Sequence, residues 1–276
     1  MQPSDTFLEV RDLHKSYPAK KGLGKHVDFV AVDEISFEIE RGETWGLIGE
    51  SGSGKTTTGR MVMALEKPTG GVVTLGGVDV TRMAGTELRR FRKRMQIVFQ
   101  DSGSTFNPRR SVGDQIAFSI VRHGVVESDR TRSRVVELLE RVGLTEAHYD
   151  RYIHELSGGQ RQRLGICRAL ATEPDFLLLD EPTAALDVSV QAQILNLLKD
   201  LQAERGLTML LITHDLSLVE YMCNRAGVLD KGKLVEQGDV DDLFTHPRSA
   251  VTRTLLDAVL DPTLPAPDPT IDRSTQ

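Results

Sequence analysis

The sequence has only two cysteines, no long apolar run and no excess of positive charge. The two cysteines, Cys167 and Cys223, form no metal-binding pattern and fit a reducing compartment without disulfides. No apolar run approaches the roughly 18 residues of a membrane span, and no basic patch with an apolar core opens the chain, so we expect neither a transmembrane helix nor a signal peptide. The net charge of −6 argues against a general nucleic-acid binder.

The composition is ordinary for a globular protein, with 276 residues, 39% hydrophobic and 27% charged. Short apolar runs alternate with helical periodicity after residue 170, which predicts βαβ units around a parallel sheet. Earlier strands, at 7–10 and as a pair at 30–32 and 35–39, predict a small antiparallel sheet, with Tyr17-Pro18 breaking the first strand. Residues 111 to about 170 predict an inserted helical subdomain.

The most informative stretch is Gly-Glu-Ser-Gly-Ser-Gly-Lys-Thr at residues 49–56, which fits the phosphate-loop pattern G-x-x-x-x-G-K-[ST]. Glycines let backbone N–H groups surround a β-phosphate, Lys55 brings charge to the β- and γ-phosphates, and Thr56 offers a hydroxyl to Mg²⁺. A ligand-free Gly/Ser-rich turn is the alternative. A buried strand at 44–48 and a helix at 56–65 flank the loop and favour nucleotide binding.

Polar residues also follow three other predicted strands. Gln100 follows strand 95–99, Asp180 and Glu181 end strand 176–180, and His214 follows strand 207–213. Ligands of open α/β sheets bind at the carboxyl ends of the strands. Asp180 suits water-mediated Mg²⁺ coordination, and Glu181 can polarise an attacking water. Each residue alone has an ordinary structural interpretation; their joint position at strand ends beside a phosphate loop favours a functional role.

The segment Leu-Ser-Gly-Gly-Gln at 156–160 precedes a helix predicted at 161–171. Ser157 can cap this helix, and the two glycines leave backbone N–H groups open to an anion. The simpler interpretation is a capped helix start without a ligand.

Together these motifs resemble, in order and spacing, an ABC-type ATPase cassette over residues 7–245. The resemblance implies a RecA-like P-loop NTPase core with an antiparallel β subdomain and an α-helical subdomain at about 111–170. It also implies that Tyr17 stacks on adenine, that Glu181 is the general base, that His214 holds the γ-phosphate and the base, and that Asp187 links the two sites of a dimer. The implied phosphate-binding residues are Gly49, Glu50, Ser51, Gly52, Ser53, Gly54, Lys55, Thr56 and Thr57.

The same resemblance assigns the Mg²⁺ and water shell to Thr56, Gln100 and Asp180, with Gln100 also acting in catalysis. The signature residues of one subunit would contact the γ-phosphate of a nucleotide on the opposite subunit; they are Ser157, Gly158, Gly159 and Gln160.

Four further stretches resemble oligopeptide, dipeptide and nickel importer cassettes; they lie at 100–113, 152–163, 186–193 and 246–256. The sequence departs from that pattern after Asp101, where Ser-Gly-Ser-Thr-Phe replaces a proline-aromatic stretch, and at Val251, where tyrosine is common. No cysteine follows Cys223, so we predict no iron–sulfur cluster. Residues 246–276 form a C-terminal extension, proline-rich and predicted to be disordered after 260.

The resemblance implies an ATP-binding, ATP-hydrolysing subunit of an importer of peptides or similar small solutes, using ATP and Mg²⁺. Implied partners are a second cassette, as homodimer or heterodimer, two transmembrane permease subunits and an extracytoplasmic solute-binding protein, with no nucleic acid. The implied location is the cytoplasmic face of the cell membrane, as a peripheral subunit. Alternatives are a cassette for another substrate or an exporter, a soluble ABC protein of DNA repair or translation, and a non-catalytic regulatory module.

Overall fold

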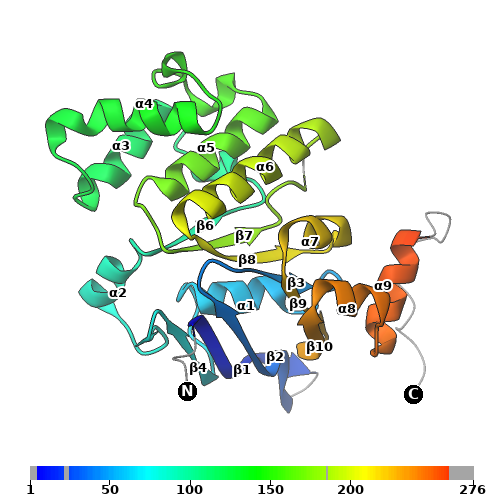
Figure 1. Ribbon diagram of the computed structural model, residues 1–276. Coiled ribbons are helices and arrows are strands. Elements are labelled where there is room, and N and C mark those ends of the chain that lie inside the picture. Colours follow the sequence, from blue (N-terminus) through cyan, green and yellow to red (C-terminus); the bar gives the residue numbers. More distant parts are fainter. Residues whose placement is uncertain (1–4, 22–24, 185, 261–276) are drawn as a thin grey trace.

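A six-stranded sheet runs through the middle of the protein, with helices on both faces (Figure 1). The computed structural model describes residues 5–21, 25–184 and 186–260. The strand order is β10-β9-β3-β8-β7-β6, and neighbours are parallel except β10, which pairs antiparallel with β9. The strands are β3 (Thr44–Ile48), β6 (Met95–Val98), β7 (Phe176–Asp180), β8 (Thr208–Thr213), β9 (Arg225–Asp230) and β10 (Lys233–Asp239).

The second sheet is antiparallel, as predicted, and has the order β2-β1-β4-β5. Its strands are β1 (Thr6–Lys21), β2 (Lys25–Glu40), β4 (Gly70–Leu75) and β5 (Val78–Asp79). Two details of the prediction are wrong. Pro18 does not end β1, because β4 pairs with β1 only as far as His14, and an edge segment tolerates proline. The predicted strand pair is one strand, β2, with an irregular register around Glu34, whose φ is +53°.

Of the helices that the structure describes, α3, α4 and α5 lie between β6 and β7, α8 and α9 follow β10, and each of the others connects two strands. Among described residues 111–170 there is no strand, as predicted, and α3 and α4 lie far above the sheet in Figure 1. None of the helices described has the length and hydropathy of a membrane-spanning segment. The helices are α1 (Lys55–Val62), α2 (Gly85–Phe91), α3 (Val112–Arg122), α4 (Thr131–Arg141), α5 (Gly158–Leu170), α6 (Val188–Arg205), α7 (Leu216–Met222), α8 (Val240–Thr245) and α9 (Ala250–Leu260).

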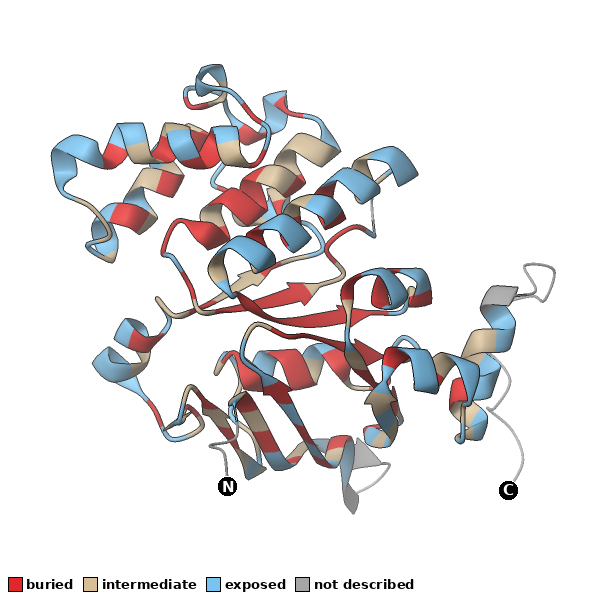
Figure 2. Ribbon diagram, in the orientation of Figure 1, coloured by how far each residue is buried: buried red, intermediate tan, exposed pale blue. Residues whose placement is uncertain are grey.

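The central strands are buried on both faces (Figure 2). In β7, Leu177 and Leu179 belong to the core beneath α5 and α6, whereas Phe176 and Leu178 belong to the core that includes α1 and the antiparallel sheet. This alternation follows from the two-residue period of a strand, and β8 shows the same alternation. Because each central strand packs against two cores, its register in the sheet is fixed. The positions of the residues that follow the strand ends are therefore fixed as well.

The C-terminal helix α9 is hydrogen-bonded to one carboxylate on β10, and its residues Val251, Leu255 and Leu256 also pack against the core. Glu236 accepts hydrogen bonds from the backbone N–H groups of Arg248 and Ser249, at 2.8 and 2.9 Å, and from the Thr252 hydroxyl at 2.5 Å. Partial burial favours the neutral acid, but these hydrogen bonds outweigh it and hold the pKa of Glu236 below its ordinary value. The predicted tail disorder concerns residues 261–276, which lie outside the described part.

Acid should therefore loosen α9. The lowered pKa stabilises the folded chain above the ordinary glutamate pKa near 4.3, and this contribution is lost as the pH falls through the lower folded value. The protection factors of α9 amides, which are corrected for the intrinsic pH dependence of exchange, should fall on acidification over that range, and Glu236→Ala should lower them at neutral pH. Glu137→Ala, on the exposed side of α4, is the control. Equal protection of α9 in wild type and Glu236→Ala would contradict the attachment.

Candidate functional site

The phosphate loop runs from the carboxyl end of β3 to the first turn of α1. At Gly54 the backbone has a φ of +110°, and a Cβ there would lie 2.4 Å from the Ala31 carbonyl oxygen. At Gly49 a Cβ would lie 2.2 Å from the Leu229 carbonyl oxygen. Both positions require glycine because backbone atoms of β2 and β9 press on the loop.

The β9–β10 turn supports this loop from behind. The Gly232 N–H donates to the Ser53 carbonyl oxygen at 2.9 Å, and the Asp33 N–H of β2 donates to the Gly232 carbonyl oxygen at 2.8 Å. The chain of bonds ties the loop to the antiparallel sheet. The Ser53 hydroxyl is buried and has no hydrogen-bond partner within the described part of the chain. A buried, unpaired hydroxyl in a loop of this shape fits an oxyanion ligand such as phosphate.

Lys55 carries its charge into the centre of the loop. Its side chain is 6% exposed, and its ammonium group donates to the carbonyl oxygens of Gly49 at 2.6 Å and Glu50 at 2.7 Å. Burial lowers the pKa of Lys55, and the carboxylates of Glu181, Asp180 and Glu50 offset part of that shift. The loop thus holds a desolvated cation where a phosphate would bind.

Strand pairing brings Glu181 and His214 together. Asp180 at the end of β7 is opposite Ile212 of β8, so the residues that follow both strands emerge at one edge of the sheet. His214 Nδ1 lies 2.9 Å from Glu181 Oε1. Glu181 has a φ of +47°, a left-handed conformation that is uncommon for glutamate and typical of functional sites, and its N–H donates to the Ile212 carbonyl oxygen at 2.9 Å.

Asp180 lies beside this pair and beside Lys55. Burial and the neighbouring charge of Glu181 raise the pKa of Asp180, while Arg60 and Lys55 oppose the shift. Among described residues no group of three His, Cys, Asp or Glu side chains could hold a metal by itself. One carboxylate with the nearby Thr56 hydroxyl fits Mg²⁺, which uses few protein ligands and completes its shell with phosphates and water.

A hollow of about 300 Å³ opens over the loop. Beyond the loop and Glu181, it is lined by Tyr17 of β1 and by Phe29 and Ala31 of β2. The strand register pairs Tyr17 with Phe29, which is 58% exposed. Phe29 was missed in the sequence because the strand was expected to begin at residue 30; the apolar residues continue back from there to Phe29, and this is the signal that could have found it.

The structure does not bring every predicted residue to this hollow. Gln100 and Gly158 instead line a second hollow of about 200 Å³ with Arg161. Ser157 caps α5: the Gln160 N–H donates to its hydroxyl at 3.3 Å, while the Ser157 N–H donates to Gln160 Oε1 at 3.0 Å. The helix start was therefore predicted three residues late, because the signature glycines are themselves helical.

The loop that contains Gln100 is bonded to α5. Gln162 Nε2 donates to the Phe99 carbonyl oxygen at 3.3 Å, and the Arg168 guanidinium donates to the carbonyl and hydroxyl oxygens of Thr105 at 2.8 and 2.6 Å. Asp187 caps α6 through its bond from the Val190 N–H, at 3.0 Å. The predicted site residues thus form two groups. One group, with Glu181, lies at the phosphate loop, and the other, with Gln100 and Ser157, lies near the start of α5.

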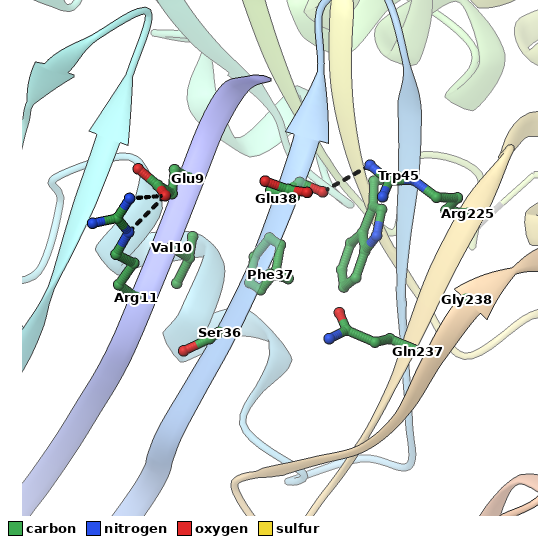
Figure 3. Close-up of a pocket in the computed structure, with 10 residues that line it drawn as sticks. All are labelled: Glu9, Val10, Arg11, Ser36, Phe37, Glu38, Trp45, Arg225, Gln237 and Gly238. Carbon is green, nitrogen blue, oxygen red and sulfur yellow. Dashed lines mark hydrogen bonds and ion pairs between the residues drawn. The ribbon is translucent and has the colours of Figure 1, made fainter. Parts of the chain in front are cut away.

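A larger hollow, of about 450 Å³, lies away from the phosphate loop, between β1, β2, β9 and β10 (Figure 3). Its floor is Trp45 stacked on Phe37, with ring centroids 4.4 Å apart. Arg225 spans it, donating to the Glu38 carbonyl oxygen at 3.1 Å and to Glu43 Oε1 at 2.7 Å. Of the charged side chains that line it, Glu9 pairs with Arg11, and Arg225 pairs with Glu43 beside it.

Replacing Arg225 with alanine should destabilise the fold by about 3 kcal/mol, because Glu43 is 9% exposed and would keep a buried charge without its partner. Chemical denaturation measures this loss. The matched control is Arg82→Ala, which removes the exposed ion pair with Asp79 and should cost no more than about 1 kcal/mol. Equal losses in both variants would contradict a special role for the buried pair.

Comparison with known proteins agrees with this geometry. The family model described as "ABC transporter" matches residues 32–184. The oligopeptide transport ATP-binding protein OppF of Bacillus subtilis is 46% identical over 273 residues, covering 98% of this chain and 86% of that protein. The dipeptide transport ATP-binding protein DppF of Lactococcus lactis is 44% identical over 270 residues, covering 96% and 83%.

Solved structures agree as well. The ATP-binding cassette MJ0796, in a dimeric post-hydrolysis state bound to ADP and Pi, is 28% identical and superposes with a TM-score of 0.76, covering 84% of this chain and 98% of that one. The cbiO1 protein of Clostridium perfringens is 31% identical with a TM-score of 0.75, covering 88% and 92%. The predicted cassette fold is confirmed, and the chain belongs to the ABC transporter family, whose ATP-binding proteins it matches over almost its whole length.

Proposed function

We propose that the chain is the ATP-binding and ATP-hydrolysing subunit of an ABC importer, and that the imported solutes are peptides or similar small molecules. The observation that carries the proposal is the phosphate loop beside the Glu181–His214 pair, at neighbouring strand ends of one sheet. The peptide class is supported by the names and identity of the relatives, 46% for OppF and 44% for DppF.

The residues of the loop hollow would share the chemistry with residues at the neighbouring strand ends, including Gln100, which lines the second hollow. Lys55 and the loop N–H groups would hold the β- and γ-phosphates, and Tyr17 would stack on the base. Thr56, Asp180 and Gln100 would supply oxygens to Mg²⁺, which when bound neutralises charge on the phosphates. Glu181 would accept the proton of the attacking water, and His214, hydrogen-bonded to it, would orient that carboxylate toward the γ-phosphate.

The signature residues would complete the site of a second cassette. Ser157, Gly158, Gly159 and Gln160 stand at the N-terminus of α5, where backbone N–H groups favour an anion, and Asp187 would link the two sites. Ser157 to Gln160 do not line the loop hollow, within the described chain, so their nucleotide would belong to a partner cassette. Isolated monomers would therefore bind ATP and hydrolyse it slowly.

The remaining partners follow from the importer assignment. Two permease subunits would span the membrane, an extracytoplasmic protein would deliver the solute, and this chain would sit on the cytoplasmic face. We assign residues 7–245 to the cassette, about 111–170 to its helical subdomain, and 246–276 to a C-terminal extension.

Three measurements test the proposal. The purified chain should release phosphate from ATP in a Mg²⁺-dependent manner, and affinity purification from its native cell should recover permease subunits. The complex in vesicles should take up peptides only with ATP. Phosphate release without any membrane partner, together with tight and salt-sensitive nucleic-acid binding, would refute the importer assignment.

A further inference from the structure

Tyr17 is held in place by a residue 49 positions away in the sequence. Its hydroxyl donates to Glu66 Oε1 at 2.5 Å, so the end of β1 is joined to the segment that follows α1. This bond raises the pKa of Tyr17, with burial as the second cause, and the phenol therefore stays protonated as a donor. The ring stands beside the phosphate loop, where it lines the hollow of about 300 Å³.

Glu66 is itself fixed by Lys15. The two side chains, 15% and 21% exposed for Lys15 and Glu66, form an ion pair with a nitrogen–oxygen distance of 3.0 Å. The same ammonium group donates to the Lys67 carbonyl oxygen at 2.8 Å. Burial opposes ionisation of Glu66, but the hydrogen bonds from Tyr17 and Lys15 outweigh it and lower its pKa, so the acceptor is a carboxylate.

Lys15 also restricts which face of the aromatic ring is open. Its ammonium group lies over the Tyr17 ring, 5.0 Å from the centroid. One face of the ring is thus occupied by a cation from its own strand, and the opposite face remains for a planar ligand. A ring fixed at its hydroxyl and covered on one face loses little freedom when a base stacks on it, which favours affinity.

We propose that Glu66 is a positioning residue which, braced by Lys15, fixes the Tyr17 ring as the stacking platform for the base of the bound nucleotide. The inference rests on the proposed function, because it takes the hollow over the phosphate loop to be the ATP site. Glu66 and Lys15 would then affect only the binding of the base. The triphosphate would be held by residues 49–57, and neither side chain is hydrogen-bonded to those residues in the described part of the chain.

The test compares a nucleotide with a ligand that has no base. Affinities for ATP and for inorganic triphosphate, both with Mg²⁺, are measured by calorimetry on the full chain. Glu66→Ala and Tyr17→Phe should each weaken ATP binding about three- to tenfold, the effect of one hydrogen bond, and leave triphosphate binding unchanged. The double variant should be no weaker than either single one, because both remove the same bond. Glu66→Gln, which keeps an acceptor, should restore part of the affinity.

The control is Glu87→Ala, which removes an exposed glutamate from α2 and should change neither affinity. Thermal melting of each variant checks that the chain is folded. Wild-type ATP affinity in Glu66→Ala, or equal weakening of ATP and triphosphate, overturns the positioning role while the ATP site stands. Failure of the wild-type chain to bind either ligand overturns the proposed function, and this inference with it.

Discussion

Glu181→Gln should bind ATP with wild-type affinity and hydrolyse it about 10²–10⁴-fold more slowly, the usual contribution of a general base. Glutamine keeps the shape of the side chain but accepts a proton far less readily than a carboxylate. It can also keep a hydrogen bond to His214, now 2.9 Å from the carboxylate, so the local arrangement should survive. With ATP bound but uncleaved, the variant should accumulate as a dimer of cassettes.

Phosphate release, ATP titration and size-exclusion chromatography with ATP measure these three effects. The chain offers a close control in Glu173, which shares the left-handed backbone, with a φ of +53° against +47° for Glu181, but pairs with Arg134 on the surface. Glu173→Gln should leave hydrolysis unchanged. If Glu181→Gln released phosphate at the wild-type rate, the base would have to be another group.

Lys55→Ala should weaken ATP binding about 100-fold or more, because removing a buried, hydrogen-bonded charge costs its ligand about 3 kcal/mol. Removing this ammonium group has a second effect. Asp180, Glu181 and Glu50 all act on Lys55, and without it their negative charge would face the phosphates uncompensated.

Calorimetric titration with ATP and Mg²⁺ measures this loss. Lys55→Arg should restore little affinity, because the larger guanidinium group does not fit a side-chain position that is only 6% exposed. Lys93→Ala, which removes a lysine outside the loop, is the control and should bind ATP normally. An unchanged affinity in Lys55→Ala would mean that the phosphates bind elsewhere.

Local sequence patterns predicted the central sheet closely. The strands predicted at 176–180 and 207–213 lie within a residue of their observed positions, because a short buried apolar run is a local signal. The predicted helix 56–65 ends early, at Val62, since Ala64 adopts a left-handed conformation with a φ of +47°. The sequence pattern of this segment does not predict the left-handed residue that ends the helix.

The predictions failed mainly where the structural role of a residue depends on contacts with residues that are distant in the sequence. Pro18 is tolerated in β1 because the pairing of β4 with β1 ends at His14. That end point is determined only when the sheet assembles. Motif spacing named the candidate site residues, which remain a prediction. It did not predict the link from Tyr17 to Glu66, because residues 49 positions apart meet only after β1 and α1 have packed. Motif spacing indicates candidate ligand-binding groups, whereas the groups that hold them in place are determined by tertiary contacts.

The β9–β10 turn has a practical consequence for protein engineering. Short exposed hairpin turns are usually chosen for tags, inserted domains or new chain termini, because they tolerate length changes. Here the backbone of Gly232 bonds to Ser53 on one side and to Asp33 on the other. An insertion at Lys231 would displace the support of the phosphate loop, so this turn, although it looks like a permissive surface site, should be avoided when the chain is labelled or permuted.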